Sequence, residues 1–269
     1  MKEKVFTVER NRNSHIIIPK FILKNFDNEN GSLYQMDVYD MRINLGHSKT
    51  INTRKGYYTD STEEYLNASY EKPFADQIKR IICWDFSNLY PITEEFIITA
   101  KRFICSLFFR DPQMFDNIQS KSTIFQFCHV KKEDRADLPV LAMSQEDYTF
   151  VFDKYMLVFA QTEGTSSFVL PLSGLYNATF FNSSAMIMPV APHFALVLID
   201  KDAEKHIVTN ESVRVLRIPD YNVARLNVLA LYHQRRTNHK KALGYSWVVA
   251  QDRETLEKLS KDYSIHFPE

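Results

Sequence analysis

Residues 185–199 read AMIMPVAPHFALVLI, two apolar runs (185–190 and 194–199) with a Pro-His pair between them. Two further short apolar runs occupy 156–160 and 168–172, and Gly, Asn, Ser and Pro residues separate the four. Apolar runs of this length, bounded by turn-forming residues, are typical of buried strands. We therefore predict a sheet in this half of the chain, largely covered on one face.

The pattern changes to helical spacing after this sheet. A helix is predicted from Asp220, which caps it, to about residue 241. A last strand over 246–250 and a last helix over 252–261 complete the chain.

A strand is also predicted near the start of the chain, over residues 32–40. It follows the polar cluster 27–31, a strong turn signal, and it is rich in aromatic residues. A second short strand is predicted near Tyr57 and Tyr58.

Two helices are predicted between these β segments. From Thr62 to Ile82 the apolar residues have approximately helical spacing, and Pro73 is expected to break or kink this helix. Residues 93–110 begin with a capping threonine and two glutamates and then carry an apolar stripe. We expect Phe103 and Ile104 of this stripe to be buried.

Helices and strands that are segregated along the chain favour an α+β fold. The prediction is an N-terminal small β unit, a helical middle, and a C-terminal mixed sheet with flanking helices. No low-complexity linker is present, so residues 1–269 are expected to form a single domain. The short charged stretch 131–137 marks the alternative division, into halves 1–130 and 139–269.

The charge balance and the short apolar runs restrict which partners the chain is expected to bind. The 269 residues include 33 Lys and Arg and 33 Asp and Glu, so nucleic-acid binding is not expected. The first 13 residues are charged and lack the apolar core of a signal peptide, and no apolar run is long enough to cross a membrane. We therefore expect no membrane association and a cytoplasmic location.

The metal-binding residue types show no ligand pattern. Cys83, Cys105 and Cys128 lie far apart, which argues against a cysteine-based zinc site and fits a reducing compartment. His233 and His239 are six residues apart, so they do not share a helix face as an i, i+4 pair would. Neither a metal nor another cofactor is predicted.

Seven segments of the chain resemble, in order, the family called domain of unknown function 4238. The segments are 15–26, 33–40, 57–59, the acidic helix around Glu71, 109–112, 189–192 leading into 194–198, and Leu226-Asn227. The resemblance covers nearly the whole chain and implies the fold and a cytosolic, microbial setting. It brings no established activity.

Two departures mark this chain as a divergent member. The family histidine three positions before the proline corresponds to Ile16, so His15 is offset by one. The polar Thr-Ser-Asp-Asn-Pro segment of the family corresponds here to 168–174, which lacks the aspartate. A site built from that segment in relatives would be altered or lost here.

Five polar residues of the matching segments are candidate catalytic residues. If they converge, a histidine with two carboxylates and an arginine could support hydrolysis or metal-assisted phosphodiester cleavage. The alternative is structural: a strand start, a turn and a helix C-terminus would use the same residue types. The candidates are His15, Asp40, Glu71, Arg110 and Asn227.

The chain has one basic cluster, formed by Arg235, Arg236, Lys240 and Lys241. Such a cluster could bind phosphates, but cations at the C-terminus of a helix also complement its dipole and stay solvated. We favour the second interpretation.

Two functions stay open at this point. The first is a non-catalytic protein that binds a protein partner or itself through its many aromatic residues, in a setting such as microbial or phage conflict. The alternative is a hydrolase or nuclease that uses the His, Asp, Glu and Arg candidates. Whether the protein is an enzyme is therefore uncertain from sequence.

Overall fold

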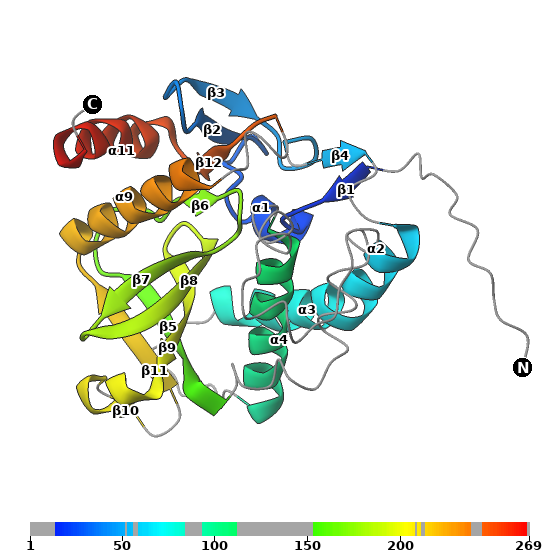
Figure 1. Ribbon diagram of the computed structural model, residues 1–269, viewed down its shortest axis with the longest axis vertical. Coiled ribbons are helices and arrows are strands. Elements are labelled where there is room, and N and C mark those ends of the chain that lie inside the picture. Colours follow the sequence, from blue (N-terminus) through cyan, green and yellow to red (C-terminus); the bar gives the residue numbers. More distant parts are fainter. Residues whose placement is uncertain are drawn as a thin grey trace, which may run out of the picture.

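A six-stranded mixed sheet lies at the centre of the computed structural model (Figure 1). The structure describes residues 14–51, 53–55, 59–83, 93–111, 153–207, 209–210, 213–237 and 244–267. Strand β11 runs parallel to β5, and the other neighbours are antiparallel. In spatial order the strands are β10 (Thr209–Asn210), β11 (Val213–Ile218), β5 (Tyr155–Thr162), β9 (Phe194–Asp200), β8 (Ser183–Ala191) and β7 (Tyr176–Phe180).

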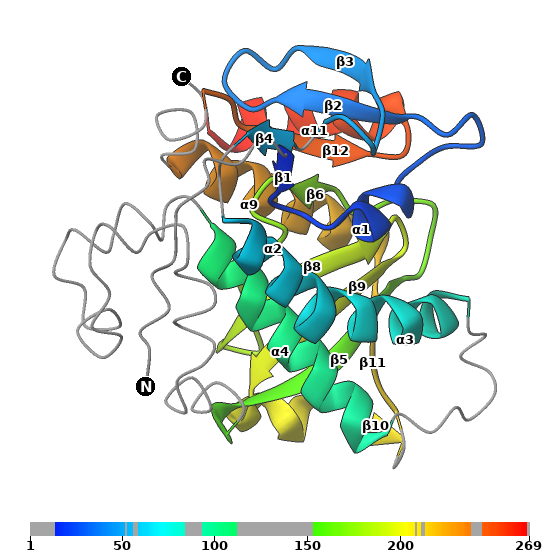
Figure 2. The ribbon, with the colours of Figure 1, turned by 90° about the vertical axis from the view of Figure 1, so that its right-hand side faces the viewer.

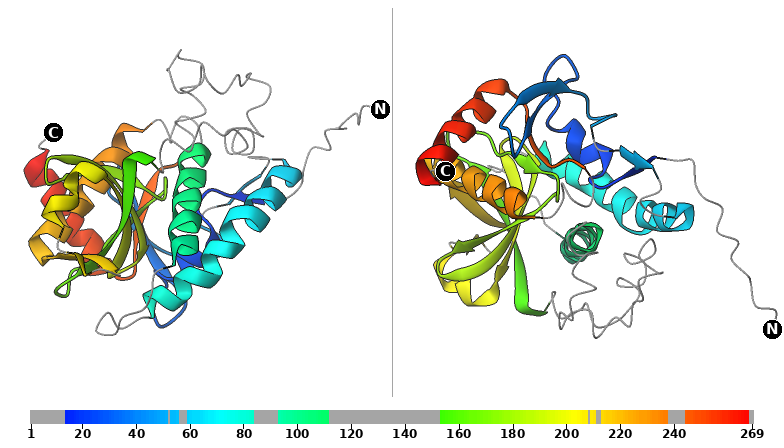
Figure 3. Two further views of the ribbon diagram at one scale, coloured as in Figure 1. Left: turned by 90° about the horizontal axis from the view of Figure 1, so that it is seen from below. Right: turned by 45° about the horizontal axis from the view of Figure 1, so that its top comes forward.

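Helices cover both faces of this sheet (Figure 3, left). Along β9 the side chains alternate between two cores: Leu196 and Leu198 face α3 and α4, while Val197 and Ile199 face α9 and α11. All four are fully buried. The expectation of a sheet largely covered on one face is therefore wrong, because the central strands lie between two helical layers and show no alternation of polar and apolar residues.

A second, antiparallel sheet joins the two ends of the chain. Its order is β3 (Ile43–Gly46), β2 (Leu33–Asp37), β12 (Trp247–Ala250) and β6 (Leu170–Pro171). Strand β2 pairs with β12, with Asp37 opposite Trp247. The N-terminal β segment thus lies beside the last strand of the chain, at the top of Figure 2. The apolar run 168–172 contributes only β6, and it belongs to this sheet.

Two short strands, β1 (Ser14–Ile16) and β4 (Thr53–Lys55), pair with each other near helix α1 (Lys20–Lys24). The strand predicted near Tyr57 and Tyr58 lies outside the described residues, and so does the charged stretch 131–137.

The first long helical segment changes type in its middle. Helix α2 (Asp60–Leu66) continues through a π-helical turn (Asn67–Glu71) into α3 (Lys72–Ile82). Pro73 lies in the first turn of α3, directly after the π-helical turn. A proline lacks the N–H and collides with the carbonyl four residues earlier, and the wider π turn accommodates both effects. The helix therefore neither ends nor breaks at Pro73.

Helix α4 (Glu94–Arg110) agrees with its prediction. The Thr93 side chain accepts a hydrogen bond from the Phe96 amide and so caps the helix. Phe103 and Ile104 are buried, as expected, and the Phe103 ring stacks on Phe74 of α3 at 4.2 Å between centroids. Figure 2 shows α2, α3 and α4 in front of the central sheet.

Two long helices cover the other face. Helix α9 (Asp220–Arg236) starts after Pro219, so Asp220 is its first residue and not its cap. It ends at Arg236, earlier than predicted. Helix α11 (Arg253–His266) starts at its cap Asp252. A 3-10 helix (Lys201–His206) follows β9.

The described residues confirm the α+β class, with a C-terminal mixed sheet and flanking helices. None of their helices combines the length and the apolar character that a membrane crossing would need.

Candidate functional site

Three polar residues of α9 stand seven positions apart: Asp220, Asn227 and Gln234. Seven residues are close to two helical turns, so the three side chains lie on one face. Each accepts a hydrogen bond from a backbone amide of the segment 165–173. We call this row the polar ladder.

Asn227 is the central member of the polar ladder. Its Oδ1 accepts from the Val169 amide at 3.0 Å, and its Nδ2 donates to the Ser167 carbonyl at 2.8 Å. The side chain is buried, so these bonds satisfy backbone groups that water cannot reach. The structure thus gives this predicted site residue a structural role.

Asp220 holds the start of the same segment. Its Oδ1 accepts from the Ser166 amide at 2.9 Å, and this backbone hydrogen bond is the main cause that lowers the pKa of the Asp220 carboxyl. The carboxylate packs so closely on Gly164 that a Cβ there would collide with it. A residue with a Cβ at 164 would therefore displace this carboxylate from its place beside Ser166.

Gln234 holds the end of the segment. Its Oε1 accepts from the Ser173 amide at 3.3 Å, and its Nε2 donates to the Ser246 hydroxyl at 2.9 Å. These bonds connect α9 to the start of β12. The segment 165–173 is thus held by side chains along the length of α9.

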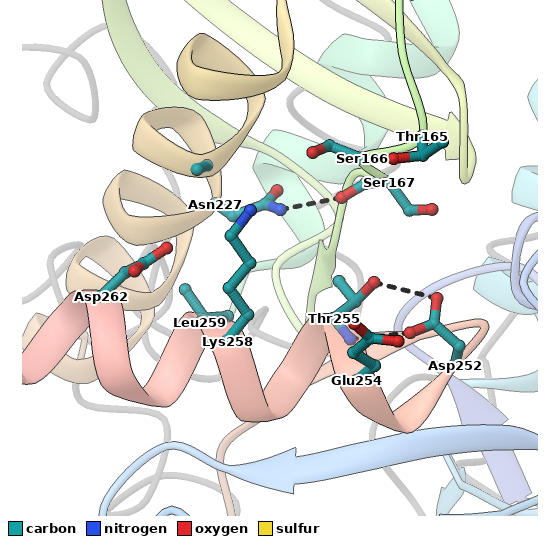
Figure 4. A pocket seen from close by; sticks show the side chains of 11 residues that line it. Thr165, Ser166, Ser167, Asn227, Asp252, Glu254, Thr255, Lys258, Leu259 and Asp262 are labelled. Atoms are coloured by element: carbon teal, nitrogen blue, oxygen red, sulfur yellow. Dashed lines mark hydrogen bonds between the residues drawn. The ribbon is translucent and has the colours of Figure 1, made fainter.

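A pocket of about 240 Å³ opens between this segment, α9 and α11 (Figure 4). One wall carries the Thr165, Ser166 and Ser167 residues, which the polar ladder holds in place. The opposite wall is the first three turns of α11. The lining residues are Thr165, Ser166, Ser167, Ala224, Asn227, Asp252, Glu254, Thr255, Lys258, Leu259 and Asp262.

The pocket is polar and its charge is unbalanced. Asp252 accepts from the Thr255 amide at 2.7 Å and from its hydroxyl at 2.9 Å, so it is occupied as the helix cap. Lys258 extends across the pocket toward Asn227 (Figure 4). Three carboxylates and one ammonium line the pocket, a net formal charge of −2.

A separate cluster of charges lies between the π-helical turn and the end of α4. Arg110 Nη1 donates to Glu71 Oε1 at 2.7 Å, and the Arg110 side chain is fully buried. Glu63 lies close enough for both charges to act on it. Burial is the largest cause that raises the pKa of the Glu63 carboxyl to about 7; Glu71 raises it further, and Arg110 and Lys20 lower it.

The π-helical turn explains why Glu63 and Glu71 act on each other. Eight residues apart in a regular α-helix, they would point about 80° apart. A π turn inserts one extra residue, so the pair behaves as if seven apart and shares a face. Sequence reasoning missed Glu63 because the inserted turn has no clear sequence signal.

The five candidate catalytic residues lie in four places. Glu71 and Arg110 form the ion pair, and Asn227 belongs to the polar ladder. Asp40 is in the turn after β2, where it accepts from the Arg42 amide at 3.0 Å. The backbone of His15 lies in β1, opposite Arg54. The structure therefore brings together only Glu71 and Arg110 by direct contact among the described side chains of this set.

The described part of the basic cluster lies on aromatic rings. The Arg235 guanidinium is 5.1 Å from the Tyr263 ring centroid, and that of Arg236 is 5.4 Å from the Tyr232 centroid. Arg236 also donates to the Tyr232 hydroxyl at 2.8 Å. Tyr232 in turn stacks on Phe267 at 4.6 Å. Lys240 and Lys241 lie outside the described residues.

The solvent side of α9 carries an exposed row, which we call the α9 stripe. Tyr221, Arg225 and Leu229 are four residues apart, and Tyr232 and Arg236 continue the same sector. Tyr221 is 66% exposed and Leu229 37%.

Within the ranges that the structure describes, no group of three or more His, Cys, Asp or Glu side chains could hold a metal ion. No protein-family model, no curated protein and no solved structure matches the chain.

Proposed function

We propose that this protein is a non-catalytic binding protein and that the α9 stripe contacts a partner protein. The observation that carries the proposal is the exposure of Tyr221 and Leu229 beside Arg225 on one helix face. Tyrosine and arginine are, with tryptophan, the residue types enriched among those that dominate binding energy at protein interfaces.

The charge of the α9 stripe indicates what kind of partner surface would complement it. Arg225 and Arg236 are its charged members, and the described stripe contains no carboxylate. A partner with acidic groups around an apolar centre would complement it. The stripe also lies on rigid support, because the buried side of α9 packs on the central sheet and holds the polar ladder. Such a surface loses little conformational freedom on binding.

The test compares two double variants in partner capture from the native host. Tyr221→Ala with Leu229→Ala removes the apolar members of the α9 stripe. Leu45→Ala with Ile265→Ala removes two exposed apolar side chains elsewhere. We expect the first variant alone to lose the captured protein, and the purified partner to bind wild type at least tenfold more tightly than that variant. Equal binding by both variants would refute the proposal.

Self-association is an alternative occupant of the same surface. Sedimentation velocity over a range of concentrations distinguishes it, since a dimer through the α9 stripe would dissociate in the Tyr221→Ala, Leu229→Ala variant.

We propose a hydrolase as the second candidate function, supported by the cluster of Glu63, Glu71 and Arg110. A carboxyl with a pKa of about 7 next to an ion-paired carboxylate has the protonation behaviour of a general acid or base. Hydrolysis of ester or phosphodiester substrates that is lost in Glu63→Gln and kept in the exposed neighbour Glu64→Gln would favour it.

A cytoplasmic location and membership of the domain of unknown function 4238 family belong to the same proposal. The first rests on the sparse cysteines, and the second on the order of the matching segments.

A further inference from the structure

The pocket between the segment 165–167 and α11 is on a different side of α9 from the α9 stripe. Ala224 and Asn227 of α9 line it, whereas Tyr221, Arg225 and Leu229 face solvent. A ligand of this pocket is therefore independent of the protein-binding surface.

Two features make the pocket a built site. Its serine and threonine wall is fixed because Asp220 accepts a hydrogen bond from the Ser166 amide and Asn227 donates one to the Ser167 carbonyl. The wall therefore needs little rearrangement to receive a ligand. Its volume of about 240 Å³ equals the share of about eight liquid waters, which suits a molecule of roughly ten non-hydrogen atoms or fewer.

The charges decide which small molecule fits. Within the described ranges, no hydrogen bond or ion pair joins the Lys258 ammonium to another side chain, and the ammonium reaches across the pocket (Figure 4). It acts only at longer range on the Asp220 carboxylate. Lys258 is exposed, and an anionic group of a ligand in the pocket would pair with its ammonium.

The carboxylates of the pocket favour a cationic group on the ligand. Glu254 and Asp262 lie one helical turn before and after Lys258, and the lining has a net formal charge of −2. A simple anion would be repelled by this field, and a simple cation would meet Lys258. A molecule with both charges satisfies both sets of groups.

We propose that this pocket binds a small zwitterion of the amino-acid class. The carboxylate of the ligand pairs with Lys258, its ammonium lies against Glu254 or Asp262, and the Thr165 hydroxyl bonds to a polar side chain of the ligand. Leu259 and Ala224 are the apolar lining residues and contact its carbon frame.

The test measures binding of the twenty amino acids, one at a time, to the full chain at about 10 mM by thermal shift, followed by calorimetric titration of the best one. We expect a single site. For the best ligand, the analogue without the carboxylate and the analogue without the ammonium should each bind at least about tenfold more weakly. Glycerol, a polyol without charge, should not bind.

Two variants and one control assign the site. Lys258→Met should weaken the Kd about tenfold or more, and Ala224→Leu, which fills the pocket, should abolish binding. Lys261→Met removes an exposed lysine of the same helix outside the lining and should leave the Kd unchanged. The thermal midpoint without ligand confirms that each variant folds; should Ala224→Leu fail, Asp262→Asn replaces it.

The proposal is overturned if none of the twenty amino acids binds. It is also overturned if the amine analogue or glycerol binds as tightly as the amino acid, or if Lys258→Met and Lys261→Met behave alike.

Discussion

Asn227 and Gln234 are seven residues apart on α9, and each uses its amide to bond the backbone of one buried segment, at Val169 and Ser173 respectively. The face of α9 that packs against this segment carries a polar side chain every two turns, at positions where a packed helix usually has apolar residues. The fold depends on these side chains because buried backbone groups without partners are costly.

Replacing Asn227 tests this dependence. Asn227→Ala leaves the Val169 amide and the Ser167 carbonyl without their partner, each at a cost of about 1–3 kcal/mol. We expect the free energy of unfolding to fall by about 2–4 kcal/mol in urea denaturation. Asn222→Ala, on the same helix outside the polar ladder, is the matched control and should change it by less than about 0.5 kcal/mol. A similar loss in both variants would contradict the structural role of Asn227.

Phe103 tests the packing of α4 in the core, where it contacts α3. It is fully buried and stacks on Phe74, so Phe103→Ala should lower the free energy of unfolding by about 3–5 kcal/mol in chemical denaturation. Ile98 on the same helix is 40% exposed, and Ile98→Ala should cost below about 1 kcal/mol. A loss below about 1 kcal/mol for Phe103→Ala would show that this face of α4 does not form the core.

Signals within the segment itself were enough to predict α4. Contacts between residues that are distant in sequence were not predictable. The cap at Thr93 and the apolar stripe are both readable within one turn or two. Strand β7 is half exposed and mixed in composition, and β11 finds its parallel neighbour β5 more than 50 residues away. No single-segment pattern contains such a pairing.

In the site, too, the individual residues were easier to predict than their contacts with distant parts of the chain. Asp220 was predicted only as a helix cap and Asn227 only through the family resemblance, and Gln234 was not singled out. The structure shows the segment that all three side chains bind. The closeness of Glu63 to Glu71 depends on the π-helical turn, which the helical periodicity did not predict.

The raised pKa of Glu63 predicts how the free energy of unfolding depends on pH. Its pKa rises from 4.5 to about 7 on folding, so between these values the folded state binds more protons than the unfolded state. The free energy of unfolding should therefore decrease as the pH rises through this window, and the loss should be complete above about pH 7. Glu63→Gln should be more stable than wild type at pH 8 by on the order of 1 kcal/mol, after allowance for partial exposure.

The check for Glu63 is a series of urea denaturation curves from pH 5 to 8. The difference between Glu63→Gln and wild type should grow across this range, whereas Glu64→Gln, an exposed neighbour, should follow wild type. A constant difference would show that Glu63 does not titrate within this pH range.

Limited proteolysis tests the single-domain prediction. Strand β2 pairs with β12, and Gln251 Nε2 donates to the Asp27 carbonyl at 3.1 Å, so the first and last parts of the chain share contacts. A cut near residues 131–137 should therefore yield fragments that stay together and unfold in one transition. Two fragments that separate and each fold alone would instead support the halves 1–130 and 139–269.

The basic cluster predicts the response to nucleic acid. Arg235 and Arg236 already lie on the rings of Tyr263 and Tyr232, and the chain as a whole has no net charge. A nonspecific phosphate surface needs a wide basic field and free aromatic faces on which bases stack. We expect no submicromolar binding of DNA or RNA in titrations at about 150 mM salt, where weak phosphate contacts are screened. The control repeats these titrations with a variant in which Arg235, Arg236 and Lys240 are all replaced by alanine. Tight binding by wild type that falls steeply with salt and disappears in this variant would make the cluster a phosphate-binding surface and would strengthen the nuclease alternative over protein binding.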